Sequence, residues 1–413
     1  MKLLQVDTLE EAREKIWHCY KKIKLKSHIK NIDEIGEAIL AEDIYARENV
    51  PAFRRSVVDG YAVYAADTAG AQDAIPVFLK LQGIVEMGKA PEFKIKSGYC
   101  AYVPTGGMLP EGANAVVMLE YTESIGGLSK GVSIAIYEPA SIGTGMVDIG
   151  DDIKKDQLFL KKGTLIGPKE KAALSALGIY SFAVFTPLNL SIISTGDELV
   201  PPNANPSYGE VRDINTSALK ALAIKRGFKV ISCKVLPDNE EKIEAALREA
   251  LPLSDIIAIS GGSSQGDKDY TALLIDRVSK PGVFTHGLAL KPGKPSILGW
   301  DEESSTLLAG LPGHPVAAMM VFELILGNLC NKLFSRSSPF IIPATIATNL
   351  PGDPGRAVCQ PVKLHLINGA YEAEPVFGKS GLISTLKKAD GYIMIDLNRE
   401  GLKKSEPVLV NLF

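Results

Sequence analysis

The sequence contains little cysteine and few aromatic residues. Five cysteines (Cys19, Cys100, Cys233, Cys330 and Cys359) are scattered through 413 residues without a CxxC pair. An odd, widely spaced set of this kind predicts reduced thiols, and it argues against a disulfide framework or a cysteine zinc site. We therefore expect a protein of the cytoplasm.

The chain also lacks a charge excess and long apolar runs. Its 45 lysines and arginines nearly balance 48 aspartates and glutamates, which gives a formal net charge of −3. Nucleic-acid proteins usually carry a basic excess, so we expect no nucleic-acid partner. No run approaches eighteen apolar residues, and the first residues do not have the apolar core of a signal peptide. We expect no membrane partner either.

The pattern of helix-like and strand-like segments changes along the sequence and predicts several domains. Residues 8–23 have helical spacing, with Thr8 as the expected N-cap. From 47 to 140, short β-rich runs are separated by glycine and proline, which predicts a β domain inserted into an N-terminal or linker domain made of 1–46 and 141–184. Short β-rich runs occur again over 335–413 and predict a C-terminal β domain.

Residues 185–334 alternate regularly between strand-like and helix-like segments. The predicted strands are 190–194, 228–235, 255–260 and 306–309, and the predicted helices are 215–226, 240–250, 270–278 and 316–329. We expect Asp238 to cap the second of these helices. Such alternation predicts a mostly parallel, doubly wound sheet that binds its ligand outside the carboxyl ends of the strands.

Three loops rich in glycine and proline follow apolar runs in this region: Gly261–Gly266, Lys291–Pro295 and Gly310–Pro315. Glycine lets backbone N–H groups approach an anion, proline stiffens the loop, and lysine adds positive charge. Together they predict a site for a phosphorylated or oxyanionic ligand.

The first of these loops also fits the GxSxG pattern of serine hydrolases. Ser264 would be the nucleophile, with Asp269 and one of His286, His314 and His365 completing a triad. The pattern stands between a predicted strand and a predicted helix, as that chemistry requires. A serine hydrolase therefore stays open as an alternative to an anion cradle.

Four carboxylates lie in glycine-rich loops: Asp59, Asp152, Glu198 and Asp269. If several of them converge on an anionic ligand, a bridging divalent cation would relieve their repulsion. Hard carboxylate oxygens suit Mg²⁺. The sequence alone does not show whether they converge.

Seven segments in series carry a resemblance to a known family. They are Ser56–Val63 (S-x-x-D-G-Y-A-V), Pro104–Val117, Gly150–Ile153, Ser194–Val200 (S-T-G-D-E-L-V), Gly261–Thr271, Lys291–Pro295 and Leu311–Val316. Their order and spacing resemble those of the MoeA family of molybdopterin molybdenumtransferases, which is also represented by the E domain of gephyrin.

This resemblance implies a multidomain α/β plus β fold. Its parts would be a doubly wound molybdopterin-binding α/β domain, an inserted β domain, a helical linker domain and a C-terminal β-barrel-like domain. It also implies a homodimer, with each active site between the α/β domain of one subunit and the inserted domain of the other. The adenylylating enzyme and the apo-enzymes that accept the cofactor are further expected partners.

The implied reaction inserts molybdate or tungstate into adenylylated molybdopterin and releases AMP, with a divalent cation such as Mg²⁺ as cofactor. The implied catalytic residues are the four carboxylates above, with Glu198 and Asp269 as metal ligands. The implied substrate-binding residues are Thr105, Gly196, Gly261, Gly262, Ser264, Gly266, Lys291, Lys294, Pro312, Gly313 and Pro315.

The chain departs from the family pattern at several positions. His314 stands where asparagine is usual, and Ala317 replaces a serine. Met146–Ile149 lacks the arginines that commonly precede the Gly150–Ile153 segment. A gephyrin-like scaffold without catalysis and a nucleotide-acting protein of the CinA type are further alternatives, although a scaffold needs neither the loop carboxylates nor the lysines.

Overall fold

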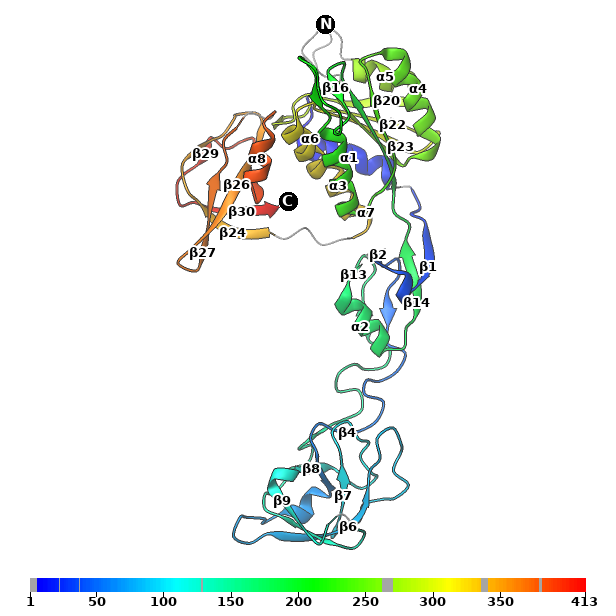
Figure 1. Ribbon diagram of the computed structural model, residues 1–413, viewed down its shortest axis with the longest axis vertical. Helices are drawn as coiled ribbons and strands as arrows, with labels where there is room; N and C mark the ends of the chain where they lie inside the picture. Colours follow the sequence, from blue (N-terminus) through cyan, green and yellow to red (C-terminus); the bar gives the residue numbers. More distant parts are fainter. Residues whose placement is uncertain are drawn as a thin grey trace. The chain divides into compact units, whose positions relative to one another are not determined.

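The computed structural model describes residues 6–21, 23–36, 38–127, 129–261, 270–335, 341–378 and 381–413. The chain forms two compact units (Figure 1). The first, here called the α/β–barrel unit, comprises Met1–Ile29, Gly163–Leu165 and Ala183–Phe413. The second, the β-insert unit, comprises Lys30–Lys162 and Ile166–Phe182.

A six-stranded sheet forms the centre of the α/β–barrel unit. In order across the sheet, its strands are β18 (Lys229–Leu236), β15 (Asn189–Thr195), β19 (Ile256–Ser260), β23 (Thr306–Leu311), β22 (Ile297–Asp301) and β20 (Pro281–His286). The first four run parallel, and the last two are antiparallel to their neighbours. The predicted parallel sheet is therefore present, extended by two antiparallel strands that the alternation did not reveal.

Helices cover both faces of this sheet. α4 (Glu240–Ala250) and α5 (Tyr270–Val278) pack their apolar sides on one face, where they share a buried core with β15, β19, β22 and β23. α3 (Asn215–Arg226) and α6 (Pro315–Phe322) pack together and against β15 and β23. Strands buried on both sides explain the nearly unbroken apolar runs in the sequence.

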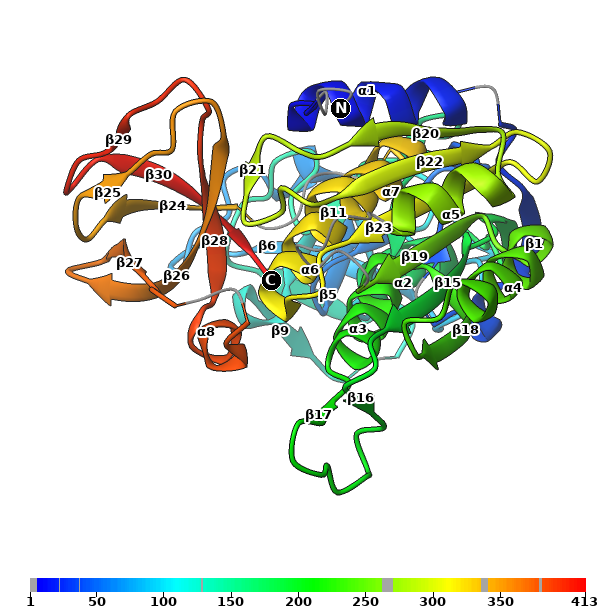
Figure 2. The same ribbon diagram turned by 90° about the horizontal axis from the view of Figure 1, so that it is seen from above.

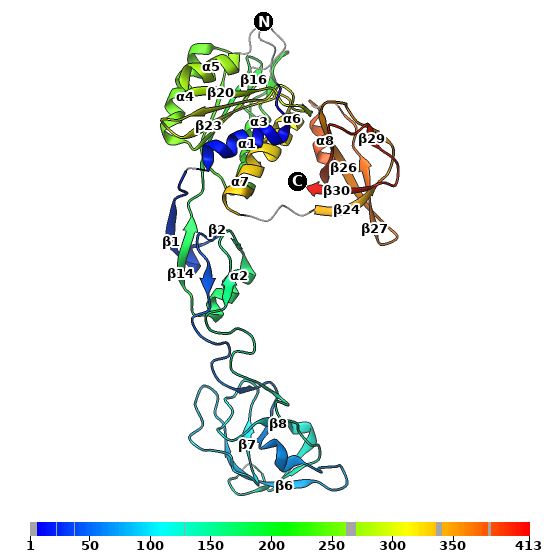
Figure 3. The ribbon, with the colours of Figure 1, turned by 180° about the vertical axis from the view of Figure 1, so that it is seen from behind.

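The predicted N-terminal helix is confirmed as α1 (Leu9–Tyr20), with Thr8 as its N-cap in a capping box with Glu11. It lies beside α7 (Asn328–Leu333), as Figure 3 shows. The Tyr20 hydroxyl donates to the Asp255 carbonyl at 2.8 Å, and its ring packs edge-on against Trp300. This helix therefore belongs to the α/β–barrel unit, although the sequence grouped it with the linker.

One expectation about helices needs correction. Asn239, and not Asp238, caps α4: its side chain accepts from the Lys242 N–H at 2.9 Å. Among the described residues, the helical segment Pro315–Leu333 is, by length and composition, apolar enough to span a membrane. It is 72% buried inside the protein, as expected for a helix that fills a core against the sheet.

The helical run after β23 is not uniform. α6 passes into a π-helical turn, η5 (Glu323–Gly327), before α7. π-Helical turns are rare and often occur at functional sites. η5 holds Glu323, which is 8% exposed and paired with Arg226 of α3, itself 6% exposed. Arg226 Nε donates to Glu323 Oε2 at 2.8 Å, and a second guanidinium N–H donates to Oε1.

The C-terminal part of the same unit is a closed five-stranded barrel, drawn in orange and red in Figure 2. Its strands are β24 (Ile341–Ile346), β26 (Ala357–Ile367), β27 (Ala370–Pro375), β28 (Gly391–Ile395) and β30 (Pro407–Leu412). Pairing of β26 with β28 closes the barrel around an apolar core. β21 (Leu290–Lys291) pairs in parallel with the start of β26 and so connects the α/β part to the barrel.

The β-insert unit is built on a second six-stranded sheet. Its strands, in order, are β8 (Ala115–Met118), β5 (Gly60–Val63), β7 (Tyr99–Val103), β6 (Val77–Ile84), β10 (Ser133–Ile136) and β9 (Thr122–Ile125). Alternate residues of β5 enter two different apolar clusters: Tyr61 and Val63 face one, and Ala62 faces the other. The sheet therefore has a core on both faces.

The remainder of this unit is less helical than the predicted linker. It holds the helix α2 (Pro168–Ala176) and short strand pairs among its described residues. Two such pairs are β3 (Ile44–Tyr45) with β12 (Leu158–Leu160), and β4 (Arg55–Ser56) with β11 (Met146–Val147). The predicted fold class is confirmed, while the domain boundaries drawn from the sequence stay predictions.

The buried pair between Arg226 and Glu323 generates a stability prediction. Arg226→Met should lower the free energy of unfolding by about 3–5 kcal/mol, because it leaves the Glu323 carboxylate buried without a counter-charge. The double variant Arg226→Met/Glu323→Leu should recover most of this loss. Urea unfolding followed by tryptophan fluorescence reports on the α/β–barrel unit, because the two tryptophans, Trp17 and Trp300, both belong to that unit. A double variant no more stable than the single one would contradict this account.

Candidate functional site

The carboxyl ends of four parallel strands lie in one row at an edge of the α/β sheet. The register pairs Thr195 with Leu236 across β15 and β18. Ser260 of β19 pairs with Leu311 of β23 on one side and with Ser194 of β15 on the other. The loops after these strands therefore begin side by side, which is where open α/β sheets bind ligands.

Asn215, the first residue of α3, connects the carboxyl end of β19 to the turn after β23. Its Nδ2 donates to Ser260 Oγ and to the Gly313 carbonyl, each at 2.7 Å. The Ser260 hydroxyl donates to the Pro312 carbonyl at 3.3 Å. The carboxyl end of β19 and the turn after β23 are thus held in a fixed relation by one buried carboxamide.

Glycine makes the close approach of these loops possible. Gly261 has φ +116°, and a Cβ on it would lie 2.1 Å from the Thr195 carbonyl oxygen. A Cβ on Gly313 would lie 3.7 Å from Gly261 Cα. Backbone groups of three loops can therefore approach one ligand, as the glycine-rich pattern predicted.

Two buried polar atoms at this edge lack a protein partner within the described part of the chain. They are Thr195 Oγ1 and Asn215 Oδ1. An unpaired buried polar group costs free energy, and its presence in a native fold calls for an explanation such as a ligand or water. Both atoms lie where the sequence predicted ligand binding.

Negative charge gathers beside Thr195. Burial raises the pKa of the Asp238 carboxyl, and the nearby charges of Asp197 and Glu198 add to the rise. The Thr195 side chain lowers the pKa of Asp238 and so partly offsets this rise. Among the described residues, however, the Thr195 hydroxyl makes no hydrogen bond of normal length and angle. The Asp238 backbone N–H donates to Asp197 Oδ1 at 3.0 Å, which keeps the loops after β15 and β18 together.

These carboxylates offer hard oxygen donors, which are the ligands Mg²⁺ prefers. Across the residues that the structure describes, however, no group of three or more histidine, cysteine, aspartate or glutamate side chains has the geometry of a metal site. Glu198 is the described member of the predicted ligand pair, while Asp269 lies outside the described residues. The donor chemistry fits a hard divalent cation, and Glu198 is the described residue that would contribute to holding it.

The two predicted anion-binding lysines differ in environment. Lys291 Nζ lies 3.0 Å from Asp353 Oδ2, and this hydrogen-bonded ion pair lowers the pKa of Asp353. Lys294 is exposed, and no ion pair of its ammonium occurs within the described ranges. Its backbone carbonyl accepts from Leu288 N at 3.0 Å, which fixes the turn. Lys294 is thus the better placed of the two to meet a free anion.

The predicted residues Pro312, Gly313 and Pro315 form the turn into α6, with His314 at the N-cap position. Pro315 occupies the first turn of the helix, where a missing N–H is tolerated. Gly196 begins the turn after β15, and a Cβ on it would lie 2.8 Å from Glu198 Oε2. These residues surround the row of strand ends described above.

A second group of predicted residues lies in the β-insert unit. The Thr105 backbone N–H donates to Asp59 Oδ1 at 2.8 Å, so the structure brings these two together. Both residues are exposed. Asp152 is also exposed, and its backbone N–H donates to the Val50 carbonyl at 3.1 Å in the turn beside Gly150.

Four predicted site residues, Gly262, Ser264, Gly266 and Asp269, lie outside the described residues. Asn215, Thr195 and Asp238, by contrast, belong to the edge of the sheet and were not among the predicted site residues. Asn215 gave a partial signal, because asparagine at the start of a predicted helix marks a helix terminus. The sequence could not reveal that its side chain bridges segments 45 and 98 residues away.

Family models match nearly the whole length of the chain. The MoeA N-terminal region (domain I and II) matches residues 7–178, and the MoeA C-terminal region (domain IV) matches residues 343–413. Between them, a model described as "Probable molybdopterin binding domain" matches residues 191–332. The row of strand ends lies within this middle match.

Relatives and solved structures extend over the same length. The chain is 31% identical over 412 residues to the molybdopterin molybdenumtransferase of Haemophilus influenzae, which covers 98% of each chain. It is 30% identical to that of Bacillus subtilis, covering 90% of this chain and 86% of the relative. A crystal structure of the molybdopterin biosynthesis MoeA protein from Pyrococcus horikoshii matches with a TM-score of 0.80 and 35% identity over 99% of both chains.

A doubly wound α/β domain with glycine-rich loops at its strand ends, joined to a β-insert unit and a closed barrel, defines a multidomain protein of the molybdopterin-binding class. The matches run through all of these parts in one order. The chain belongs to the MoeA family.

The close approach at Gly261 generates a second prediction. Gly261→Ala should lower the free energy of unfolding by about 2–4 kcal/mol, since the new Cβ adds a backbone clash to the strain of a positive φ. Gly209→Ala is the matched control, because Gly209 has φ +100° with no atom within 4 Å of its would-be Cβ. Equal losses in the two variants, measured by tryptophan-monitored urea unfolding, would rule out the clash.

The raised pKa of Asp238 generates a third prediction. The folded protein favours the protonated carboxyl, so the stability that Asp238 contributes is full below its ordinary pKa of 3.8 and is lost as the pH rises through the raised folded value. Asp238→Asn should therefore raise the melting temperature at pH 7, and the gain should shrink toward zero on acidification. We expect the gain in the free energy of unfolding to be less than about 1 kcal/mol, because the Asp238 side chain is partly solvated.

The control for this variant is Glu303→Gln, which neutralises an exposed carboxylate in a turn. It should leave the melting temperature nearly unchanged at both pH values. A gain for Asp238→Asn that is independent of pH would refute the electrostatic cause.

Proposed function

We propose that this protein is a molybdopterin molybdenumtransferase that catalyses the last step of molybdenum cofactor biosynthesis. Membership of the MoeA family over nearly the whole chain is the observation that carries the proposal. Relatives that the chain covers at 86–98% of their length bear that enzyme name. The substrates are molybdate, or tungstate, and adenylylated molybdopterin, and the products are the metal-loaded cofactor and AMP.

The row of strand ends supports this assignment on chemical grounds. An adenylylated, phosphorylated substrate needs several backbone N–H donors near one point, and the glycines at positions 196, 261 and 313 allow that approach. Thr195 Oγ1 and Asn215 Oδ1 offer further unpaired groups to a polar ligand. Lys294, which forms no ion pair with any residue that the structure describes, adds a positive charge for an oxyanion.

In the proposed reaction, water attacks the phosphoanhydride that joins AMP to molybdopterin, and AMP leaves. The dithiolene sulfurs of molybdopterin bond to molybdenum while oxo ligands depart as water. The role of the protein in this reaction is to position the reacting groups and to stabilise the negative charge of the phosphates and the oxyanion. Glu198 and Asp269 would orient the attacking water and receive its proton.

Mg²⁺ belongs to the proposal as the cofactor that neutralises phosphate charge when bound. Burial raises the pKa of Asp238, and the nearby Asp197 and Glu198 carboxylates add to the rise; this gathering of negative charge supports a cation-attracting edge. Mg²⁺ should therefore raise the melting temperature of the protein, and the rise should be smaller in Glu198→Gln.

A homodimer is a further part of the proposal. Asp59, Thr105 and Asp152 lie in the β-insert unit, and a subunit arrangement that brings this unit to the strand ends of a partner would join the two groups of predicted residues. A cytoplasmic location, an adenylylating enzyme as upstream partner and apo-enzymes as acceptors complete the proposal. Neither the scaffold nor the Ser264 hydrolase is favoured by the comparisons.

The direct test supplies purified protein with adenylylated molybdopterin, Mg²⁺ and either molybdate or tungstate, and follows AMP release. Release that depends on the oxyanion supports the transferase, and the oxyanion that supports faster release identifies the metal. Tight binding of the nucleotide substrate without AMP release would indicate a carrier instead.

Lys294 provides a sharper prediction within the same assay. Lys294→Ala should raise the molybdate concentration needed for half-maximal AMP release by about 10- to 100-fold, since a charged hydrogen bond contributes about 1.5–3 kcal/mol. Lys24→Ala, which removes an exposed lysine on the segment after α1, is the matched control and should leave this concentration unchanged. An unaltered molybdate dependence in Lys294→Ala would remove the residue from the oxyanion site.

A further inference from the structure

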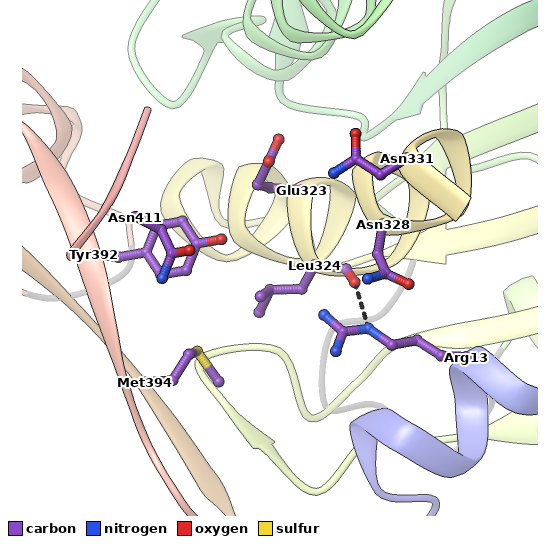
Figure 4. Close-up of a pocket in the computed structure, with 8 residues that line it drawn as sticks. All are labelled: Arg13, Glu323, Leu324, Asn328, Asn331, Tyr392, Met394 and Asn411. Atoms are coloured by element: carbon purple, nitrogen blue, oxygen red, sulfur yellow. Dashed lines mark hydrogen bonds between the residues drawn. The ribbon is translucent and has the colours of Figure 1, made fainter. Parts of the chain in front are cut away.

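A second polar pocket lies in the α/β–barrel unit, away from the row of strand ends. Residues of α1, η5, α7 and the barrel strands β28 and β30 line a cavity of about 160 Å³ (Figure 4). Its polar lining is Arg13, Glu323, Asn328, Asn331, Tyr392 and Asn411. The cavity is much larger than a single water and smaller than a typical pocket for a drug-sized ligand.

Arg13 places a cation at this pocket. Its Nε donates to the Leu324 carbonyl of the π-helical turn at 2.9 Å, drawn as a dashed line in Figure 4. This bond fixes the plane of the guanidinium and leaves its outer N–H groups available. Their ion-pair contact is a loose 3.8 Å approach of Nη1 to Glu10, whose side chain is 70% exposed.

The acid that lines the pocket is already neutralised. Glu323 holds both of its carboxylate oxygens against Arg226 of α3. Glu323 therefore does not balance the charge of Arg13. The pocket has a net positive character, set by one partly buried guanidinium.

The opposite wall supplies a neutral donor. Tyr392 of β28 is 5% exposed, and burial raises the pKa of its hydroxyl to about 12. The phenol is therefore protonated at neutral pH. Within the described ranges no hydrogen bond of this hydroxyl occurs, so the phenol O–H can donate to a group in the cavity that Tyr392 lines.

Three carboxamides complete the ring of polar groups. Asn328 and Asn331 come from α7, and Asn411 comes from β30. Within the described ranges, none of these side chains makes a hydrogen bond to another protein group. Each can present an N–H to the cavity, so cation, phenol and amides together form a donor-rich lining.

The pocket is distinct from the strand-end site. That site includes the N-terminus of the helical run at Pro315, whereas Glu323 and Asn331 lie 8 and 16 residues further along it. At 1.5 Å per residue the separation is roughly 12–24 Å along the axis.

We propose that this pocket binds a small oxoanion, either a carboxylate or a tetrahedral anion such as sulfate. A planar guanidinium, a phenol and carboxamide N–H groups match the acceptor-rich surface of such an anion. The volume admits a group of a few heavy atoms. Among the described residues the counter-ion of Arg13 is the exposed Glu10, so an anion in the pocket would complement the charge of the guanidinium.

The test measures binding to the full chain by calorimetry. Sodium sulfate and sodium acetate are compared with sodium chloride at constant ionic strength, in a Lys291→Ala/Lys294→Ala background that weakens oxyanion binding at the strand ends. We expect one saturable site for at least one of the two oxoanions. The preferred anion distinguishes tetrahedral from carboxylate ligands.

Two variants in this background locate the site. Arg13→Met should weaken binding at least tenfold, because a charged donor is lost, and Tyr392→Phe about three- to tenfold, because only a hydroxyl is removed. Arg277→Met is the matched control, since Arg277 is an exposed arginine on α5 paired with Glu240. It should leave the affinity unchanged.

The proposal is overturned if neither oxoanion binds more strongly than chloride, or if binding disappears in the double-lysine background. It is also overturned if Arg13→Met binds as tightly as its parent. Should Arg13→Met fail to fold, Tyr392→Phe decides the matter, because it keeps the shape of the ring: an unchanged affinity in that variant rejects the pocket.

Discussion

The register of four parallel strands is the constraint on which the candidate site depends. β18, β15, β19 and β23 end in one row, so loops that are far apart in the sequence begin within reach of one another. The approach is closer than ordinary side chains would allow. Gly261 lies against the Thr195 carbonyl, and the Asn215 carboxamide holds the end of β19 to the turn after β23. Changing any of these contacts would move backbone donors away from a common point.

The site combines two kinds of electrostatic environment. Backbone N–H groups and Lys294 favour an anion, while Asp197, Glu198 and Asp238 accumulate negative charge beside Thr195. Opposed environments of this kind suit a reaction in which an anionic substrate and a cation must be held together. The proposed transfer of molybdate to an adenylylated cofactor has these requirements.

A second set of contacts links the α/β sheet to the barrel. The π-helical turn η5 turns Glu323 toward Arg226 of α3 and offers the Leu324 carbonyl to Arg13 of α1. Three helices far apart in the sequence thus meet at one irregular turn. The same irregularity borders the pocket that barrel residue Tyr392 completes, so one feature of packing also forms a wall of the proposed oxoanion site.

The sequence by itself determined the local structure of the α/β part and the family of the chain. Helices Asn215–Arg226, Glu240–Ala250 and Tyr270–Val278 were predicted with their observed bounds, because apolar periodicity, polar first turns and a glycine after Arg226 are local signals. The glycine-rich loops were identified for the same reason.

Only the tertiary structure decided which of these local elements meet. It assigned α1 to the α/β–barrel unit, because its buried face packs on α7 and on Trp300. It gave the capping role to Asn239 and left Asp238 to face the carboxylates of another loop. It also made Asn215 a bridge and Arg13 the wall of a pocket. Such roles depend on long-range register and on which charges are already paired, and neither property is encoded in the spacing of nearby residues.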